Sequence, residues 1–261
     1  MDLPEDVIAA DDEIIENEVS RAIDEGELSA YCQPIIEIGS GIVSAAEALA
    51  RWMQDGTAIP AAAFIPSLER RGTATGLDWV IAEQICSFLE SSLGTAAFVP
   101  VSINFSRSHI GDDGFARKLA ATTEWHGIPA DMVRVELPYA LVASGAADGL
   151  IASVAEAGFV PAADNVEGGI EGLGILASKG VHVAKVSPAW WRGRAIGELS
   201  AYAKAAEESC MLLSAEGVEN RGELDFLAEA GFPRAQGYFV GMPMPQERFS
   251  ELAEARLSAL W

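Results

Sequence analysis

The chain has 261 residues, of which half are apolar, and 39 Asp and Glu residues outnumber 17 Lys and Arg residues to give a formal net charge of -22. This length suits one domain with a large buried core. Proteins that bind duplex nucleic acid neutralise many phosphates with Lys and Arg, so this charge argues against duplex DNA as a partner. The charge does not exclude a small anionic ligand if a few cations are concentrated at one site.

The amino-terminal stretch MDLPEDVIAADDEIIENE is acidic, whereas a secretory signal is basic and then apolar. The sequence also contains no uninterrupted apolar run of about 18 residues. We therefore expect no membrane segment in this chain and a cytoplasmic location. Residues 1–22 are expected to be an acidic, solvated arm or the start of a helix, and residues 23–258 a barrel domain. The widely spaced Cys32, Cys86 and Cys210 are expected to be buried, reduced thiols.

The first predicted elements form a hairpin. Apolar spacing predicts a helix over residues 13–25, and SAYCQPIIEI predicts a first strand over residues 29–38. The turn at residues 39–41 leads directly into a second strand, IVSAAEALARW. Two strands joined by so short a turn must be antiparallel, because a parallel crossover needs a dozen residues or more.

The rest of the chain alternates helix and strand. Helices are predicted at residues 60–72, 76–93, 108–122, 143–157, 169–179, 195–208, 221–230 and 245–258. Strands are predicted at residues 97–106, 131–138, 158–163, 181–186, 211–215 and 234–239. This order is typical of an α/β fold, a TIM-like (β/α)8 barrel, here with an antiparallel first strand. In such a barrel the carboxyl ends of the parallel strands share one face, where active sites lie.

Most of these strands end in one polar residue with metal-binding or phosphate-binding chemistry. The set is Glu47, Asn104, Glu136, Asp164, Lys185, Glu216 and Gln236. Because the strand ends meet at one face of a barrel, these residues are expected to be neighbours. A single one of these carboxylates would more often be a rim residue or half of an ion pair, so the ligand-site interpretation depends on the whole set.

Five segments resemble the ordered landmarks of EAL domains. They are EALARW (residues 47–52), SINFS (102–106), VEL (135–137), AEGVE (215–219) and QGYFVGMPMP (236–245). The resemblance extends over about residues 23–252. That family consists of cyclic di-GMP phosphodiesterases and of degenerate relatives that bind the dinucleotide without cleaving it, so cyclic di-GMP is the expected ligand.

The resemblance implies roles for the polar set. The first Mg²⁺ or Mn²⁺, a hard ion that prefers oxygen ligands, would be held by Glu47, Asn104, Glu136 and Asp164. Asp164 would also bridge to a second ion. Glu216 would serve that ion or act as general base on the attacking water, and Lys185 would orient the nucleophile or stabilise developing charge. Gln236 would complete the hydrogen bonding at the last strand.

The resemblance also implies a nucleotide pocket. Arg51 would hold a phosphate, since a guanidinium can bind one bidentately. One guanine would be framed by Leu49, by the segment from Pro60 to Pro66 that includes Phe64, and by Asp78.

Three acidic groups of the family pattern are missing, all around the second ion. Asn165 stands where the family has the second of two adjacent Asp residues. Pro138 and Tyr139 replace a Thr-Glu pair whose Glu steadies the following loop, and Ser187 replaces an Asp. A hard dication is held mainly by charge and ligand number. We therefore expect one bound ion rather than two.

The remaining residues of note have structural interpretations. Glu219 is expected to brace the loop after Asp164. Trp190 and Trp191 stand where related proteins build a dimer contact, which leaves a homodimer or a protein partner open beside core packing. The histidines share no ligand spacing and are expected in surface or packing roles; they are His109, His126 and His182.

Three functions follow in order of preference. The first is a degenerate EAL domain that binds cyclic di-GMP as a signalling receptor or scaffold, with little or no hydrolysis. The second is an active metal-dependent phosphodiesterase that produces the linear dinucleotide. The third is a protein-interaction module that has lost nucleotide binding.

Overall fold

The computed structural model describes the backbone of residues 5–255 and the side chains of residues 11–255. Eight of its strands close a barrel, because β1 pairs with both β2 and β9 at the two ends of the sheet order β1-β9-β8-β7-β6-β5-β4-β2-β3. The strands are β1 (Leu28–Glu37), β2 (Val43–Gln54), β3 (Thr57–Pro60), β4 (Val101–Asn104), β5 (Val133–Pro138), β6 (Val160–Val166), β7 (Val183–Val186), β8 (Leu212–Ala215) and β9 (Arg234–Gln236).

β1 is antiparallel to both of its neighbours in the barrel. It pairs with β2 from Leu28 opposite Trp52 onwards, and with β9 through Ile35 opposite Gln236. The pairs from β2 and β4 round to β8 and β9 are parallel. The predicted barrel with an antiparallel first strand is therefore confirmed.

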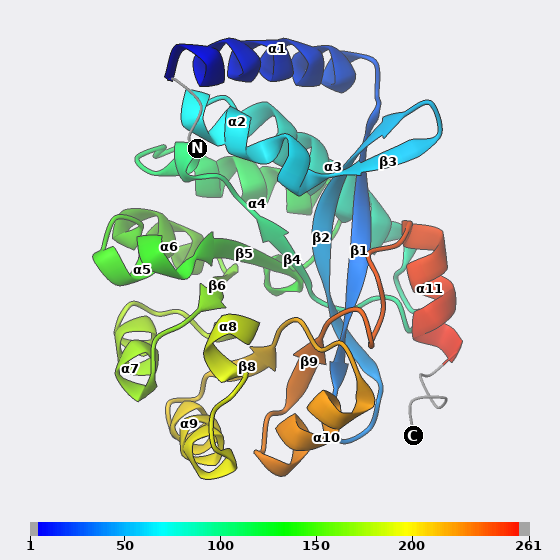
Figure 1. The fold of residues 1–261 in the computed structure, drawn as a ribbon. Coiled ribbons are helices and arrows are strands. Elements are labelled where there is room, and N and C mark those ends of the chain that lie inside the picture. Colours follow the sequence, from blue (N-terminus) through cyan, green and yellow to red (C-terminus); the bar gives the residue numbers. More distant parts are fainter. Residues whose placement is uncertain (1–4, 256–261) are drawn as a thin grey trace.

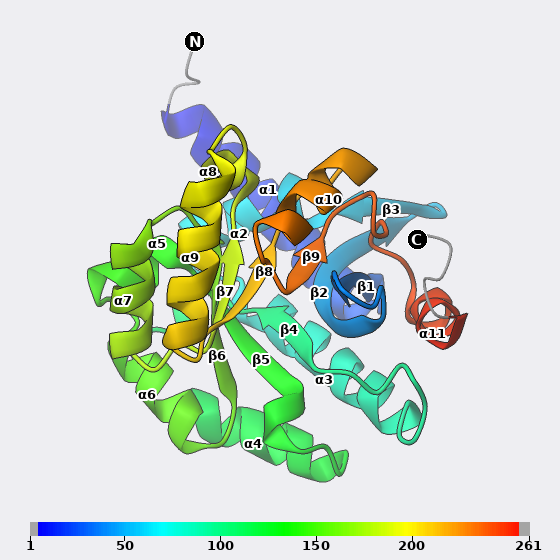
Figure 2. The ribbon, with the colours of Figure 1, turned by 90° about the horizontal axis from the view of Figure 1, so that it is seen from below.

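Helices surround the ring of strands, as Figure 2 shows for α4, α6, α7 and α9. They are α1 (Glu5–Asp24), α2 (Ile65–Arg71), α3 (Thr75–Ser91), α4 (Phe115–Trp125), α5 (Tyr139–Ser144), α6 (Asp148–Glu156), α7 (Ile170–Ser178), α8 (Pro188–Trp191), α9 (Ile196–Glu208), α10 (Arg221–Glu229) and α11 (Gln246–Ala255). Short 3-10 turns include η1 (Ala61–Ala63) and η2 (Arg107–His109).

Alternation along the strands separates the core from the barrel interior. In β5, Val133 and Val135 belong to the apolar cluster between strands and helices. Glu136, the next residue along β5, is fully buried and points to the opposite face, since successive strand residues alternate between faces. The same alternation of faces allows the other strands to point polar side chains into the barrel interior.

The amino-terminal helix α1 packs against helices α2 and α3. α1 lies across α2 (Figure 1) and buries Val19 and Ala22. Arg70 of α2 pairs with Asp12 at 2.6 Å and, through that hydrogen bond, holds the pKa of Asp12 at about 2. Residues 1–4 of the expected arm lie outside the described residues.

Several predicted elements are shorter or divided, each at a local break. The helix predicted at residues 143–157 is two helices, because Gly145 adopts a left-handed φ of 82° between α5 and α6. The helix predicted from residue 108 starts at Phe115, after η2 and a left-handed Gly111. β3 and α8 were not predicted; each has four residues, too few for periodicity to reveal.

One expectation about the cysteines is corrected. Cys32 and Cys86 are buried free thiols, but Cys210 is exposed in the turn between α9 and β8, with a φ of 52°. Trp190 and Trp191 are both buried, so of the two roles left open for them core packing is the one observed. No helix of the described chain is long and apolar enough to span a membrane.

Candidate functional site

Four carboxylates and one ammonium meet at the carboxyl ends of the strands. Lys185, on β7, lies with its Nζ 2.5 Å from Glu136 on β5 and 2.7 Å from Glu47 on β2. Its Nζ is also 3.2 Å from Glu216, which directly follows β8, and 3.4 Å from Asp164 on β6. Residues that are far apart in sequence are thus brought together as the strand pattern predicted. We call these five residues the acidic cluster.

Burial sets the protonation behaviour of the acidic cluster. Burial raises the pKa of Glu136 well above its usual value, and Lys185 opposes this change. Burial would lower the pKa of Lys185, but the surrounding carboxylates, Glu136 foremost, raise it well above its usual value. The pKa of Glu216 rises to about 7, chiefly through burial, with Lys185 opposing. A carboxyl with such a pKa can exchange a proton near neutral pH.

Amide side chains complete the hydrogen bonding around Glu47. Asn104 Nδ2 donates to Glu47 Oε1 at 2.9 Å, and Gln236 Nε2 donates to Glu47 Oε2 at 2.5 Å. Gln236 also donates to Gln33 Oε1 at 3.0 Å. Gln33 was not singled out from the sequence, although it is the one amide side chain within the apolar run of the first strand. These bonds fix the Glu47 carboxylate at the mouth of the barrel.

Asn165 turns toward its neighbour. Its Nδ2 donates to Asp164 Oδ2 at 2.6 Å, and its backbone has a left-handed φ of 53°. Asn and Asp are the non-glycine residues that tolerate this conformation best. The amide therefore satisfies a carboxylate oxygen at a position where a second carboxylate would repel it.

The four expected metal ligands are residue types that hard divalent ions prefer, but the Lys185 ammonium lies among their carboxylate oxygens. Glu47, Glu136 and Asp164 supply carboxylates and Asn104 an amide oxygen, which are the ligands that Mg²⁺ and Mn²⁺ take. Glu136 Oε2 and Asp164 Oδ1 are buried without a hydrogen-bond partner in the described chain. No three His, Cys, Asp or Glu side chains among residues 11–255 are arranged to hold a metal ion, and the Lys185 ammonium lies among these oxygens.

Two cavities open beside the acidic cluster and share Glu47 and Leu49. The larger, of about 470 Å³, lies between β2, α2 and α3 and includes Asp78, Asn104, Asp164 and Asn165 in its wall. Its other walls are mostly apolar, with Ala, Leu, Ile, Pro and Phe side chains. The smaller, of about 360 Å³, also contains Gln33, Glu216, Glu219, Gln236 and Tyr238. The Glu47 carboxylate and the Leu49 side chain thus lie in the walls of both cavities.

Arg51 lies at an alternate position of β2 after Glu47 and Leu49, and so on the same strand face, but it lines neither cavity. Its guanidinium lies 5.7 Å from the centre of the Tyr31 ring, and its Nη1 donates to the Ala50 carbonyl at 2.8 Å. Tyr238, which lines the smaller cavity, is also near enough to act on the charge of Arg51. Burial lowers the pKa of Arg51 from its usual value.

Three residues are placed differently from the sequence-based expectation. Phe64 is buried in the core, edge-on to Trp52 with ring centres 6.0 Å apart, because the η1 turn directs it inward. Pro60 is exposed at the end of β3. Neither residue lines the larger cavity. Glu219 pairs with Arg192 at 3.1 Å, so it braces the loop after β8 instead of the loop after Asp164.

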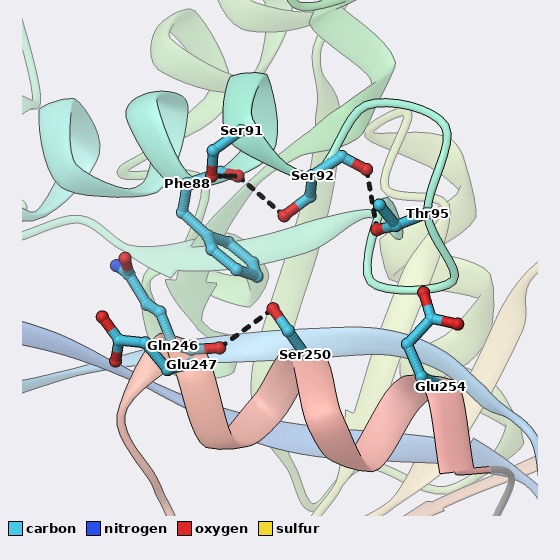
Figure 3. A pocket seen from close by; sticks show the side chains of 8 residues that line it. All are labelled: Phe88, Ser91, Ser92, Thr95, Gln246, Glu247, Ser250 and Glu254. Atoms are coloured by element: carbon cyan, nitrogen blue, oxygen red, sulfur yellow. Dashed lines mark hydrogen bonds between the residues drawn. The ribbon is translucent and has the colours of Figure 1, made fainter.

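A third cavity, of about 340 Å³, lies between the end of α3 and α11, away from these strand ends (Figure 3). Its hydroxyl groups already donate to helix carbonyls: Ser92 to Phe88 and Ser250 to Gln246. It therefore offers few free donors and is better explained as the seam where α11 packs.

The family model described as "EAL domain" matches residues 16–243. The chain belongs to the EAL domain family. Cyclic di-GMP phosphodiesterase PdeB of Shewanella oneidensis is 28% identical in an alignment of 251 residues that covers 92% of this chain and 29% of that protein. Cyclic di-GMP phosphodiesterase RocR of Pseudomonas aeruginosa is 26% identical in an alignment of 241 residues that covers 89% of this chain and 61% of that protein. The chain thus spans only part of the length of these relatives.

Solved EAL domains share the fold. The FimX EAL domain from Pseudomonas aeruginosa, in a structure bound to c-di-GMP, superposes with a TM-score of 0.78 at 17% identity. The match covers 88% of this chain and 96% of that chain. At such identity the likeness establishes the barrel, and the chemistry of this EAL domain must be argued from its own residues.

The departures from the EAL pattern have structural replacements. Tyr139, in the place of the Glu that steadies the loop after β6, packs so closely on Gly168 and Gly172 that a Cβ added to Gly168 would lie 2.2 Å from Tyr139 Oη. The Tyr139 side chain thus supports the loop after β6 by packing, where a Glu at this position would support it through its charge. Ser187, in the place of an Asp, accepts a hydrogen bond from Ala189 N and caps α8.

The residues of α8 and those just after it hold the backbone at Glu216, which sequence analysis did not foresee. Trp191 Nε1 donates to the Glu216 carbonyl at 2.9 Å, and Arg192 Nη2 donates to the Gly217 carbonyl at 2.7 Å. The only sequence signal was the pair of Trp residues directly after a strand. These two hydrogen bonds hold the backbone that carries Glu216 beside the other members of the acidic cluster.

Proposed function

We propose that this EAL domain binds cyclic di-GMP at the mouth of its barrel and acts as a signalling receptor or scaffold, with little or no hydrolysis. The observation that carries the proposal is the hydrogen bond from Asn165 to Asp164. In-line hydrolysis with two metal ions needs ligands for both. Here the second carboxylate is an amide, and that amide is bonded to the carboxylate that would bridge the ions.

The two cavities support the choice of ligand. Cyclic di-GMP carries two bases on a ring with two phosphates, and the cavities of about 470 and 360 Å³ share Glu47 and Leu49 in their walls. A base in the larger cavity would contact apolar side chains and the Asp78 carboxylate. Arg51, on the same face of β2 as Glu47 and Leu49, supplies a guanidinium for a phosphate, although the net charge of the chain is -22.

One divalent ion, Mg²⁺ or Mn²⁺, fits the proposal. Its ligands would be Glu47, Asn104, Glu136 and Asp164. When bound, such an ion polarises a phosphate oxygen and offsets the negative charge of the cluster. Lys185, whose ammonium already contacts all four carboxylates of the acidic cluster, would keep a positive charge beneath the phosphate.

A second candidate function, slow hydrolysis to the linear dinucleotide, is favoured by Glu216. Its pKa of about 7 lies where a general base works best at neutral pH. Asp164 and Lys185 are also present beside it. This candidate would require the acidic cluster to activate water without the second carboxylate at position 165.

Calorimetric titration with cyclic di-GMP tests the proposal. Wild-type protein is titrated with Ca²⁺, with Mg²⁺ and with chelator, beside Arg51→Met and the matched surface control Arg248→Met, whose side chain is 73% exposed. We expect saturable heat for wild type and Arg248→Met, and about tenfold or more weaker binding for Arg51→Met, since a charged hydrogen bond is lost. Absence of heat from wild type under every condition would leave the interaction module as the remaining function.

A further inference from the structure

Asp78 and His109 form a buried pair in the wall of the larger cavity. Asp78 lies in the first turn of α3, and its Oδ2 is 3.0 Å from His109 Nε2. The same oxygen accepts the backbone N–H of Ser106 at 3.0 Å. Asp78 Oδ1 accepts no hydrogen bond from the described residues, so it is the oxygen available to a molecule in the cavity that Asp78 lines.

Aromatic rings enclose His109, which is 1% exposed. The ring centres of Phe115, Trp79 and Phe105 lie 4.5, 5.7 and 5.8 Å from the centre of the imidazole. Its Nδ1 is buried without a partner in the described chain. A second N–H on this ring would be an unpaired donor in apolar surroundings. The neutral imidazole with its proton on Nε2 therefore fits the site, and it donates to Asp78.

Two donors on one carboxylate oxygen fix the carboxylate. The Ser106 N–H belongs to the backbone of the loop after β4, and the aromatic rings around His109 hold its imidazole in place. Neither donor can therefore move with the Asp78 carboxylate, so rotation of that side chain would break both hydrogen bonds. Asp78 is therefore held with Oδ1 free and Oδ2 occupied. This arrangement presents a pure acceptor to the cavity, since a carboxylate has no hydrogen to donate.

We propose that His109 is a positioning residue which, through Asp78, sets the preference of the larger cavity for guanine over adenine. The inference rests on the proposed binding of cyclic di-GMP. Guanine presents two adjacent N–H donors, at N1 and at its amino group, which match a fixed acceptor. Adenine presents one amino donor beside the unprotonated N1, whose lone pair would face the carboxylate. Sites built around such hydrogen bonds reject mismatched ligands strongly.

The test compares two ligands across four proteins. Binding of cyclic di-GMP and of its adenine counterpart, cyclic di-AMP, is measured for wild type, His109→Leu, His109→Gln and Phe115→Leu. Gln keeps an N–H donor, and Phe115→Leu disturbs the same aromatic packing without removing the donor. We expect the ratio of the two affinities to fall about tenfold or more in His109→Leu, less in His109→Gln, and to be kept in Phe115→Leu. Equal ratios in wild type and His109→Leu would overturn the proposal.

A double mutant separates positioning from packing. If His109 acts through Asp78, then His109→Leu changes the affinity ratio no further once Asp78→Ala has removed the acceptor. A further effect of similar size in the Asp78→Ala protein would show that His109 acts on the cavity in another way, and would count against the inference.

A ligand-free measurement distinguishes this inference from the proposed function. Nitrogen-15 NMR of the imidazole reports which ring nitrogen carries the proton. We expect the Nε2–H form in wild type and its loss in Asp78→Ala. A wild-type ring protonated at Nδ1 would overturn the inference even if cyclic di-GMP binds. If wild type binds neither dinucleotide, the proposed function is wrong. Detection of the Nε2–H form would then show only that His109 donates to Asp78.

Discussion

Lys185 Nζ lies 2.5 Å from Glu136 Oε1 at the centre of the barrel mouth, and both side chains are buried. The ammonium is the positive charge that holds four carboxylates together in this arrangement. A divalent ion would compete for the same oxygens. The acidic cluster therefore links metal affinity, stability and pH dependence in one group of residues.

Replacing Lys185 by Met is expected to destabilise the ion-free protein and to tighten its binding of Mn²⁺. Removing one partner of a buried ion pair costs about 3–5 kcal/mol, and the uncompensated carboxylates then attract a cation more strongly. Chemical denaturation with chelator and calorimetry with Mn²⁺ measure the two effects. Lys204→Met, at a side chain that is 74% exposed and 3.7 Å from Glu208, is the control and should change neither. Unchanged Mn²⁺ affinity in Lys185→Met would contradict this account.

The Asn165→Asp substitution is expected to raise the number of divalent ions bound. Asp tolerates the left-handed backbone at this position, so the change adds charge with little strain. Without ions it should destabilise the protein by about 1 kcal/mol, because a hydrogen bond to Asp164 becomes a repulsion. Calorimetric stoichiometry with Mn²⁺ is the measurement, and Asn165→Gly, which also accepts the left-handed backbone, is the control that loses the bond without adding charge. Identical stoichiometry in wild type and Asn165→Asp would argue against charge as the missing element.

Glu216 should make stability depend on pH in the ion-free protein. Its pKa is about 7 in the folded state against a usual value of 4.5, so the folded protein keeps a proton that the unfolded chain releases. Proton binding by Glu216 therefore favours the folded state. Its contribution to the free energy of unfolding is fully present below about pH 4.5 and is lost as the pH rises to about 7. The free energy of unfolding of wild type relative to Glu216→Gln should therefore fall by up to about 3 kcal/mol over that range. A constant difference between the two proteins would show that the pKa of Glu216 is not raised.

Two Gly→Ala substitutions near α7 are expected to change stability in opposite directions, because only one of them meets the Tyr139 side chain. Gly168→Ala would place a Cβ 2.2 Å from Tyr139 Oη and 3.0 Å from Gly172 Cα, and overpacking of this kind costs about 1–3 kcal/mol. Gly174→Ala, in α7 with open space around the new methyl group, should stabilise by about 0.5–1 kcal/mol. Thermal unfolding measures both. Adding Tyr139→Phe should recover part of the loss at Gly168, and no recovery would mean that the phenol oxygen is not the obstacle.

The barrel and the acidic cluster follow from the sequence because their signals are local. Apolar runs that end in Glu136 or Lys185 mark strand ends, and barrel geometry then brings those ends together. The missing negative charge at Asn165 was also visible in the sequence, by comparison with the family's two adjacent Asp residues. What the sequence did not show were contacts made across the fold, such as Trp191 with the Glu216 carbonyl and His109 with Asp78.

Some expectations were wrong for reasons of geometry. Phe64 lies in a segment that the family resemblance places at the nucleotide pocket, yet the η1 turn directs its ring into the core against Trp52. Glu219 finds a closer partner in Arg192. Cys210 stands in a turn with positive φ, where apolar neighbours in sequence do not provide burial. Side-chain direction at turns is set by backbone angles that composition does not encode.

Incubation of excess protein with cyclic di-GMP and Mn²⁺, followed by chromatography for the linear dinucleotide, distinguishes a receptor from an enzyme. Wild type is compared with Asn165→Asp and with Glu216→Ala. We predict that wild type retains bound, intact cyclic di-GMP with little or no linear product, and that the Asn165→Asp substitution increases the yield. Rapid and complete conversion by wild type, lost in Glu216→Ala, would instead identify an active phosphodiesterase and refute the receptor assignment.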